Sequence, residues 1–228
     1  MNIAGSVALV TGANRGMGRV YAEALLGRGA SKVYAAARNP EAVDIDGVVP
    51  IALDITDADS AAAAAAAATD VTLLINNAGV SAGQNLVTGD LDKIRMEMDT
   101  NFFGTLNVIR AFPPVLGGNG GGAILNMLSV LSWLSLPRST SYSAAKAAAW
   151  SLTNGIRIEL AAQGTQVTGL HVGAVDTDMT SGLDVPKSAP ADVVAMALDG
   201  IEAGSLEVLA DDTSRYVKSR LSEPPVTP

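Results

Sequence analysis

Short, mostly apolar runs alternate with segments of helical character along the chain. The runs lie at 7–10, 32–37, 48–53, 71–75, 123–128, 166–170 and 206–210. Runs of this length, rich in Val, Ile, Leu and Ala, are typical of strands buried on both faces of a sheet. The intervening segments 19–29, 57–68 and 190–202, and the Ala-rich stretch after Lys146, predict helices. Such alternation with short connections predicts one α/β domain with a doubly wound, mostly parallel sheet of seven strands.

The composition agrees with a single globular domain and limits its partners. The chain has 228 residues, 48% of them hydrophobic, and a mean hydropathy of +0.29. Its net charge of −8 argues against nucleic acid or an anionic membrane as a partner, because both require a basic surface. No uninterrupted apolar run reaches about 18 residues, so no membrane span is expected. The N-terminus lacks the basic start of a signal peptide.

The chain contains no cysteine, which removes disulfides, thiol catalysis and cysteine metal sites from consideration. Cytoplasmic residence is compatible with this composition and is expected. His171 is the only histidine, and no constellation of metal ligands accompanies it, so no metal site is expected. A lone histidine at a strand end is more often a hydrogen-bonded structural residue than a catalytic one, and we assign His171 to the structural class.

A glycine-rich turn follows the first predicted strand at once. It reads Thr11-Gly-Ala-Asn-Arg-Gly-Met-Gly18, and a predicted helix comes after it. Glycines permit a tight turn and a close backbone approach, while the helix N-terminus offers free N–H groups to an anion. A glycine turn alone is often only a turn, but its place between strand and helix favours a site for the pyrophosphate of a dinucleotide.

The end of the second predicted strand carries Arg38 and no acidic residue. In dinucleotide-binding sheets an Asp or Glu at this place binds the ribose 2′-hydroxyl of NAD, whereas an Arg suits a 2′-phosphate. Arg15 in the glycine turn offers a second guanidinium, and two guanidinium groups can bind one phosphate through charge-assisted bonds. The sequence therefore favours NADP(H) over NAD(H), which stays possible because either arginine could be a solvated surface residue.

The sequence Tyr142-Ser-Ala-Ala-Lys146 places a phenol and an ammonium one helical turn apart, on the same helix face. A free tyrosine has a pKa of about 10, and a nearby cation lowers that pKa toward neutral pH. Ser129 follows the apolar run 123–128, at the sheet edge where open α/β sheets bind ligands. The Tyr–Lys spacing alone is a weak pattern, but with Ser129 and the glycine turn it predicts acid–base chemistry on a carbonyl or hydroxyl oxygen.

These motifs together resemble the short-chain dehydrogenase/reductase family, in its classical-size group. The resemblance rests on the glycine turn, on Asn76-Asn-Ala-Gly79, on Asp99-Thr-Asn101-Phe-Phe-Gly104 and on Ser129 with Tyr142 and Lys146, and it covers residues from about 5 to about 180. It implies a Rossmann-like fold and hydride transfer between a nicotinamide cofactor and a small molecule.

The resemblance also implies roles for particular residues. Tyr142 would be the general acid or base, Ser129 would bind the same substrate oxygen, Lys146 would bind the nicotinamide ribose and lower the tyrosine pKa, and Asn101 would anchor a water on a proton path. Arg15 and Arg38 would select NADPH. The remaining residues expected to contact the cofactor are Gly12, Asn14, Gly16, Met17, Gly18, Asp54, Ile55, Asn77, Ala78, Gly79, Gly173, Val175 and Thr177.

The second half departs from the family pattern in two places. Val172 stands where the family usually has proline, which predicts a change in loop stiffness without loss of cofactor binding. The segment 178–190, where the family places a substrate lid, is short and implies an open or shallow site. Apolar side chains after Ser129 either face a nonpolar ketone or aldehyde or pack beneath their loop, and the sequence leaves both open; they are Leu131, Trp133, Leu134 and Leu136. The tail at about 222–228 is expected to be mobile.

We therefore expect an NADPH-dependent reductase of a ketone or aldehyde, reversible as an alcohol dehydrogenase. The alternatives are an NAD-dependent alcohol dehydrogenase and a dinucleotide-sensing protein without catalysis. The family resemblance favours a homodimer or homotetramer, and the Ala-rich face after Lys146 allows such packing, while a monomer stays open. Fold and cofactor do not identify the substrate.

Overall fold

The structure is a computed structural model that describes residues 1–224; the expected mobility at 222–228 falls mostly on residues outside this range. Its strands and helices follow one another as β1 (Val7–Thr11), α1 (Gly16–Gly27), β2 (Lys32–Ala37), β3 (Val49–Ala52), α2 (Ala58–Ala67), β4 (Leu73–Asn76), α3 (Leu91–Met98), α4 (Thr105–Ala111), α5 (Pro113–Gly118), β5 (Ala123–Met127), α6 (Thr140–Glu159), β6 (Gln166–His171), α7 (Pro190–Glu202), β7 (Glu207–Leu209) and α8 (Asp212–Ser219). A π-helical stretch, Asp99–Gly104, joins α3 to α4.

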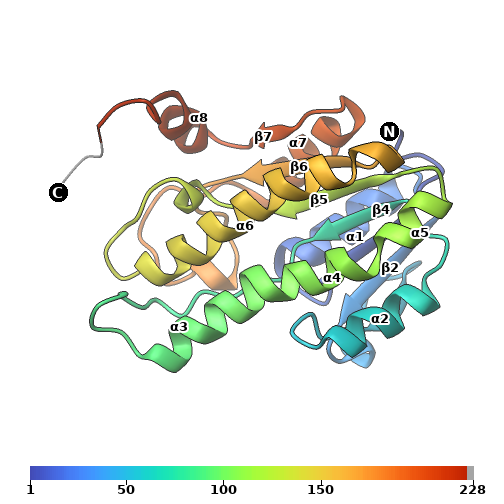
Figure 1. Ribbon diagram of the computed structural model, residues 1–228, viewed down its shortest axis with the longest axis horizontal. Coiled ribbons are helices and arrows are strands. Elements are labelled where there is room, and N and C mark those ends of the chain that lie inside the picture. Colours follow the sequence, from blue (N-terminus) through green and yellow to red (C-terminus); the bar gives the residue numbers. More distant parts are fainter. Residues whose placement is uncertain (225–228) are drawn as a thin grey trace.

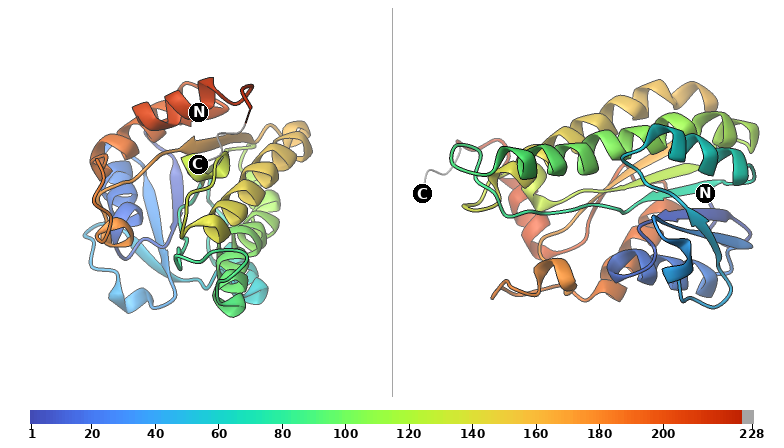
Figure 2. Two further views of the ribbon diagram at one scale, coloured as in Figure 1. Left: turned by 90° about the vertical axis from the view of Figure 1, so that its left-hand side faces the viewer. Right: turned by 90° about the horizontal axis from the view of Figure 1, so that it is seen from below.

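The strands form one sheet in the order β3-β2-β1-β4-β5-β6-β7, and every neighbouring pair is parallel. The sheet of seven strands and the Rossmann-like single domain were predicted, and the sheet is wholly rather than mostly parallel. Helices lie on both sides of it, as Figure 2 shows from two directions. The strand order reverses between β1 and β4, and the crevice beyond the carboxyl ends of the strands at such a point is where open α/β sheets bind ligands.

Alternate residues of each strand point into two separate cores. On one side, Ala8 and Val10 of β1 pack with residues of α1 and α7; on the other side, Leu9 packs with α2, α4, α5 and α6. The long helix α6 crosses the second face beside α4 (Figure 1). Because both faces of the central strands are covered, those strands are mostly apolar, which is why they could be recognised as short apolar runs.

Most element boundaries lie within a few residues of the predicted ones. Helix α1 begins at Gly16, inside the glycine turn, and not at the predicted residue 19, while β4 begins two residues later than predicted. Ser129 does not end the fifth strand directly. It lies two residues beyond β5 and starts a short 3-10 turn, Val130–Ser132. Within residues 1–224, none of the helices is both long enough and apolar enough to cross a lipid bilayer.

Candidate active site

The glycine turn between β1 and α1 has the geometry of an anion site. Gly12 and Gly16 have φ angles of +65° and +53°, and a Cβ on Gly18 would overlap the carbonyl oxygen of Gly12. Asn14 and Met17 lie within the same turn. No side chain caps the first N–H groups of α1, and its first turn contains no acidic residue. The turn therefore presents free backbone donors and the positive end of the helix dipole.

Thr11 connects the glycine turn to the segment that follows β4. Its hydroxyl oxygen accepts hydrogen bonds from the backbone N–H groups of Asn77 and Ala78, both at 3.0 Å. The side-chain amide of Asn77 donates to the carbonyl oxygen of Thr11 at 2.9 Å. A Cβ on Gly12 would meet Ala78 at 3.2 Å. The two predicted cofactor segments thus lie side by side, and Thr11, which was not predicted as a site residue, fixes their spacing.

At the predicted adenosine end, Arg38 is exposed immediately after β2. The carboxylate of Asp54 accepts two hydrogen bonds from Thr56, which hold the pKa of Asp54 below its usual value, and the charge of Arg38 lowers it further. Ile55 is buried and would be 2.9 Å from a Cβ on Gly104 in the π-helical stretch. The position after β2 is therefore cationic and open to solvent.

Ser129 is buried and lies against the loop after β6. Its hydroxyl oxygen accepts from the N–H of Leu131 at 3.1 Å, and its hydroxyl lies 3.5 Å from the carbonyl oxygen of Val172. The 3-10 turn that Ser129 begins packs against α6, the helix of Tyr142 and Lys146. The structure thus brings all three catalytic candidates to the carboxyl edge of β5 and β6.

Tyr142 and Lys146 share one face of α6, as predicted. The ammonium of Lys146 lies 5.6 Å from the centre of the Tyr142 ring and donates a hydrogen bond of 2.9 Å to the carbonyl oxygen of Met127. The expected lowering of the tyrosine pKa is not found. Burial, and next the charge of Glu97, raise the pKa of Tyr142, while burial lowers the pKa of Lys146 to about 8. Desolvation is the largest influence on the pKa of each group, because this turn of α6 is largely shielded from water.

Asn101 lies in the π-helical stretch and is 1% exposed. Its side-chain nitrogen donates to the carbonyl oxygens of Val80 and Glu97, both at 2.8 Å, and its side-chain oxygen faces the N–H of Val80 at 3.3 Å. A Cβ on Gly79 would stand 2.7 Å from that oxygen and 3.7 Å from the Lys146 ammonium. Gly79, Asn101 and Lys146 therefore meet at one point, which only a residue without a side chain can occupy.

The predicted nicotinamide segment is held by the C-terminal part of the chain. The N–H of Gly173 donates to a carboxylate oxygen of Asp211 at 2.6 Å, and Val175 pairs with Ser188 in an isolated bridge. Thr177 begins a short 3-10 turn, Asp178–Thr180. Across the crevice, a guanidinium nitrogen of Arg15 lies 3.6 Å from a carboxylate oxygen of Asp178, and both side chains are exposed. Arg15 thus connects the glycine turn to the predicted lid.

His171 is a buried, hydrogen-bonded residue, as predicted. Its Nδ1 lies 3.2 Å from the carbonyl oxygen of Ser129, and burial lowers the pKa of His171 to about 4. Its ring stacks on Trp133 at 3.8 Å, and the ammonium of Lys218 lies 4.8 Å from the centre of the Trp133 ring. For Trp133, the packing alternative therefore holds, while Leu136 is exposed. The structure describes no cluster of potential metal ligands within residues 1–224.

Sequence reasoning missed several residues that shape this site. Thr11 was interpreted only as part of a motif. Asn126 was interpreted only as part of a strand, but its side-chain oxygen accepts a hydrogen bond from the side-chain amide of Asn76 at 2.8 Å. A polar residue inside an apolar run was the available signal. Glu97 and Asp211 gave no such signal, because each lies in a segment with several other charged residues.

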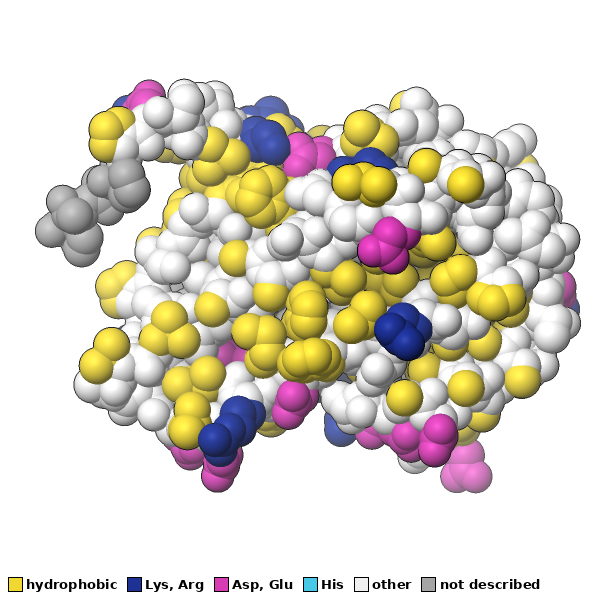
Figure 3. Space-filling view, viewed as in Figure 1, with side chains coloured by type: hydrophobic (Ala, Val, Ile, Leu, Met, Phe, Trp, Pro, Cys, Tyr) yellow, Lys and Arg dark blue, Asp and Glu magenta, His cyan; other side chains and the backbone are white. Residues whose placement is uncertain are grey.

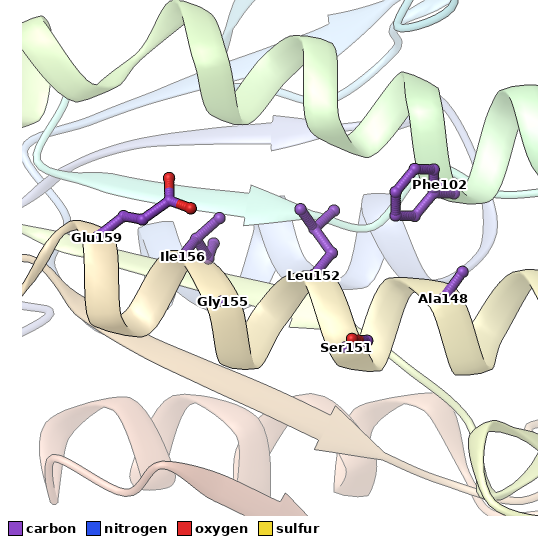
Figure 4. Close-up of a pocket in the computed structure, with 7 residues that line it drawn as sticks. All are labelled: Phe102, Ala148, Ser151, Leu152, Gly155, Ile156 and Glu159. Carbon is purple, nitrogen blue, oxygen red and sulfur yellow. The ribbon is translucent and has the colours of Figure 1, made fainter.

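A groove of about 370 Å³ lies along the outer side of α6 and contains none of the predicted site residues. Figure 4 shows its lining, in which Phe102 faces α6 from the π-helical stretch and the other side chains come from α6 itself. On the same face of the molecule, apolar side chains gather over α4 and α6 (Figure 3). Phe103, in the π-helical stretch next to Phe102, is 49% exposed.

Comparisons with known proteins agree with this geometry. The family model described as short chain dehydrogenase matches residues 6–187. The chain is 31% identical over 215 residues to the 3-oxoacyl-(acyl-carrier-protein) reductase FabG of Vibrio harveyi, covering 90% of this chain and 86% of that protein. A short chain dehydrogenase from Burkholderia cenocepacia, solved in complex with NADP, is 44% identical with a TM-score of 0.95, covering 98% of this chain and 95% of the other. A Burkholderia phymatum short chain dehydrogenase/reductase, solved in complex with NAD, is 25% identical with a TM-score of 0.85, covering 100% and 99%.

Proposed function

The chain belongs to the short-chain dehydrogenase/reductase family and is an oxidoreductase, and we propose that it reduces a ketone or aldehyde to an alcohol with NADPH. The observation that carries this proposal is the convergence of Ser129, Tyr142 and Lys146 at the carboxyl edge of β5 and β6. A sensor without catalysis has no need for a proton donor at this place.

The residues present fit a nicotinamide dinucleotide. The glycine turn leaves the N–H groups at the start of α1 free for a pyrophosphate, and Lys146 stands beside Gly79, where it would bind the nicotinamide ribose. The bound cofactor supplies the hydride; the protein supplies orientation and the proton. The cofactor contacts from Gly12 to Thr177 expected from the sequence remain part of this proposal.

The protein's own part in the reaction is to stabilise and protonate an oxygen. As the carbonyl carbon gains a hydride, negative charge develops on its oxygen, and the hydroxyls of Ser129 and Tyr142 donate to that oxygen. Tyr142 then gives up its proton and completes the alcohol. The raised pKa leaves the Tyr142 hydroxyl protonated, as a proton donor must be, but it also makes the phenol a weaker acid. The reverse reaction, alcohol oxidation, requires the tyrosinate.

The preference for NADPH rests on Arg38 and Arg15. Arg38 is exposed where a 2′-phosphate would lie, and the segment from Ser31 to Asn39 has no acidic residue to bind a free 2′-hydroxyl. To bind the 2′-phosphate, Arg15 would have to break its ion pair with Asp178. Breaking this pair costs little free energy, because both side chains are exposed and exposed ion pairs are weak. The relative solved with NADP supports this preference, while the relative solved with NAD keeps the NAD-dependent alternative in view. Fluorescence titration with NADPH and NADH decides between them.

The substrate class is a carbonyl compound of low polarity. Exposed apolar side chains flank the site, including Leu136 at 52% and Met179 at 52% exposure. One relative carries the name of a 3-oxoacyl reductase, so 3-oxo esters belong in the first screen. A panel of ketones, aldehydes and ethyl acetoacetate, followed by the loss of NADPH absorbance, tests the proposal. Activity of the wild type that disappears in Tyr142→Phe supports it; cofactor binding without turnover on the whole panel favours the sensor.

The groove and the apolar side chains along α4 and α6 support assembly into a homodimer or homotetramer. Phe102, Leu152 and Ile156 line the groove, and Gly155 leaves space for a close approach of a second helix. Light scattering of the purified protein measures the assembly state. Replacing Leu152 with Glu should shift an oligomer toward the monomer, because it places a charge in an apolar contact.

A further inference from the structure

The carboxyl group of Glu97 is completely buried next to the proposed catalytic tyrosine. Glu97 lies near the end of α3 and is 0% exposed. One carboxyl oxygen accepts the N–H of Ala82 at 2.5 Å, and the other accepts the hydroxyl of Ser141. Within residues 1–224, the ion pairs do not include Glu97. A buried carboxyl without a cation is costly, and an apolar side chain would fill this space at lower cost.

The partners of Glu97 belong to segments that form the site. Ser141 immediately precedes Tyr142, and both its N–H and its hydroxyl also lie close to the carbonyl oxygen of Gln84, at 3.3 Å and 3.1 Å. Ala82 lies three residues after Gly79, in the loop that follows β4. Glu97 therefore holds the first turn of α6 against that loop.

The backbone of Glu97 is connected to the same site. Its carbonyl oxygen accepts a hydrogen bond from Asn101, which also binds both backbone groups of Val80. One residue thus links α3, the π-helical stretch, the loop 79–84 and the start of α6. The segments that would enclose the nicotinamide ribose and the tyrosine hydroxyl share this junction.

We propose that Glu97 is a positioning residue, which fixes Tyr142 relative to the loop 79–84 and disfavours its phenolate. The proposal rests on the proposed function, since it concerns the acid of that reaction. The effect on the phenolate has support in the pKa of Tyr142. Burial is the largest cause that raises this pKa, and the charge of Glu97 is the second. A like charge close to the phenol disfavours the phenolate.

The other ionisable groups around Tyr142 can be told apart from Glu97. Lys146, on the same helix, lies 5.6 Å from the ring and acts in the opposite sense. His171, on β6, is uncharged at neutral pH because burial lowers its pKa to about 4. Arg138, which precedes α6, is exposed to solvent. Among these groups, Glu97 is therefore the one whose charge, after burial, disfavours the phenolate of Tyr142.

The test uses Glu97→Gln, Glu97→Leu and a matched control in the full chain. Glutamine keeps the shape and can accept from Ala82 and donate to Ser141, but it has no charge. Leucine removes both hydrogen bonds. Asp92→Asn on the same helix removes one charge from a side chain that is 90% exposed. In the complex with NADP⁺, the tyrosinate absorbance of Tyr142 is isolated by subtracting the spectrum of Tyr142→Phe, and its midpoint is followed against pH.

The midpoint should move to lower pH in Glu97→Gln and stay unchanged in Asp92→Asn. In the reduction of ethyl acetoacetate, or of the best carbonyl compound of the panel, Glu97→Leu should lower kcat roughly 100-fold through misplacement of the acid. Glu97→Gln should recover most of that loss, with its alkaline limb at lower pH. If Glu97→Leu does not fold, Ser141→Ala, which removes only the hydroxyl partner, takes its place.

An unchanged midpoint in Glu97→Gln, or wild-type kcat in Glu97→Leu or its replacement, would overturn the inference. These results are distinct from a failure of the proposed function. If Tyr142→Phe keeps wild-type turnover, the tyrosine is not the acid and the proposed function is wrong. If Tyr142→Phe is inactive while the Glu97 variants behave as wild type, only the role of Glu97 is wrong.

Discussion

Replacement of Gly79 by alanine isolates the tightest contact at the proposed site. Gly79 does not have a positive φ angle, so alanine adds a methyl group without backbone strain. That methyl carbon would stand 2.7 Å from the side-chain oxygen of Asn101, where ordinary contact begins at 3.4 Å. Asn101 has little freedom to move, because its amide is bound to Val80 and to the carbonyl oxygen of Glu97. The loop 79–84 must therefore shift by roughly 0.7 Å, an overpacking that costs about 1–3 kcal/mol of unfolding free energy.

The shift should reduce activity more than stability. A displacement of this size near the reacting groups lowers kcat by roughly 10- to 100-fold, since Lys146 lies 3.7 Å from the same methyl position. Urea denaturation measures the stability, and initial rates with NADPH measure kcat. Gly27→Ala, at the end of α1, is the matched control: no atom lies within 4 Å of its added methyl group, so stability should rise by at most about 1 kcal/mol. Wild-type stability and kcat in Gly79→Ala would refute the reasoning.

Three further predictions concern the cofactor, the acid range and the C-terminal helix. Arg38→Asp should weaken NADPH relative to NADH by roughly 10- to 100-fold, measured by fluorescence titration, and an unchanged ratio would contradict a role in binding the 2′-phosphate. Burial lowers the pKa of His171 from 6.5 to about 4. Between these pH values the unfolded chain binds a proton at this residue and the folded chain does not. The stability present above pH 6.5 is therefore lost as pH falls toward 4. Between pH 7 and pH 5, the unfolding free energy measured by urea denaturation should therefore fall by about 2 kcal/mol less in His171→Gln than in the wild type. Equal falls in the two proteins would exclude His171 as the origin of this pH dependence. Lys218→Met removes a 2.6 Å ion pair with Glu207 and a cation from the Trp133 ring, and should lower the unfolding free energy by about 1 kcal/mol in the same assay, whereas no change would show that α8 is held by other contacts.

The fold was predictable because burial on both faces makes the central strands short, mostly apolar runs. Val7–Thr11 and Lys32–Ala37 lie within one residue of their predicted ends. The start of α1 was predicted too late, because Gly16 and Gly18 disfavour a helix by intrinsic propensity; here Gly18 allows the close approach of Gly12, and Gly16 has a positive φ angle. The π-helical stretch had no local signal in the sequence; within it, Gly104 lies so close to Ile55 that an added Cβ would meet it at 2.9 Å.

The candidate site was predictable where spacing alone fixes the geometry. The four-residue spacing put Tyr142 and Lys146 on one helix face, and this placement is what the structure has. The direction of the tyrosine pKa was predicted wrongly, because desolvation and the charge of Glu97 depend on residues that are distant in sequence. For the same reason Glu97, within Leu91–Met98, looked like one more solvated charge of a surface helix.

The hydrogen bond from Gly173 to Asp211 and the position of Lys218 over Trp133 have a consequence for biosynthesis. As the chain leaves the ribosome, β1 to β6 and the segments around Ser129 and Gly173 emerge before the residues that brace them. The nascent protein can therefore form most of its sheet while the proposed site still lacks support, and that region is completed only when residues 207–218 add β7 and α8.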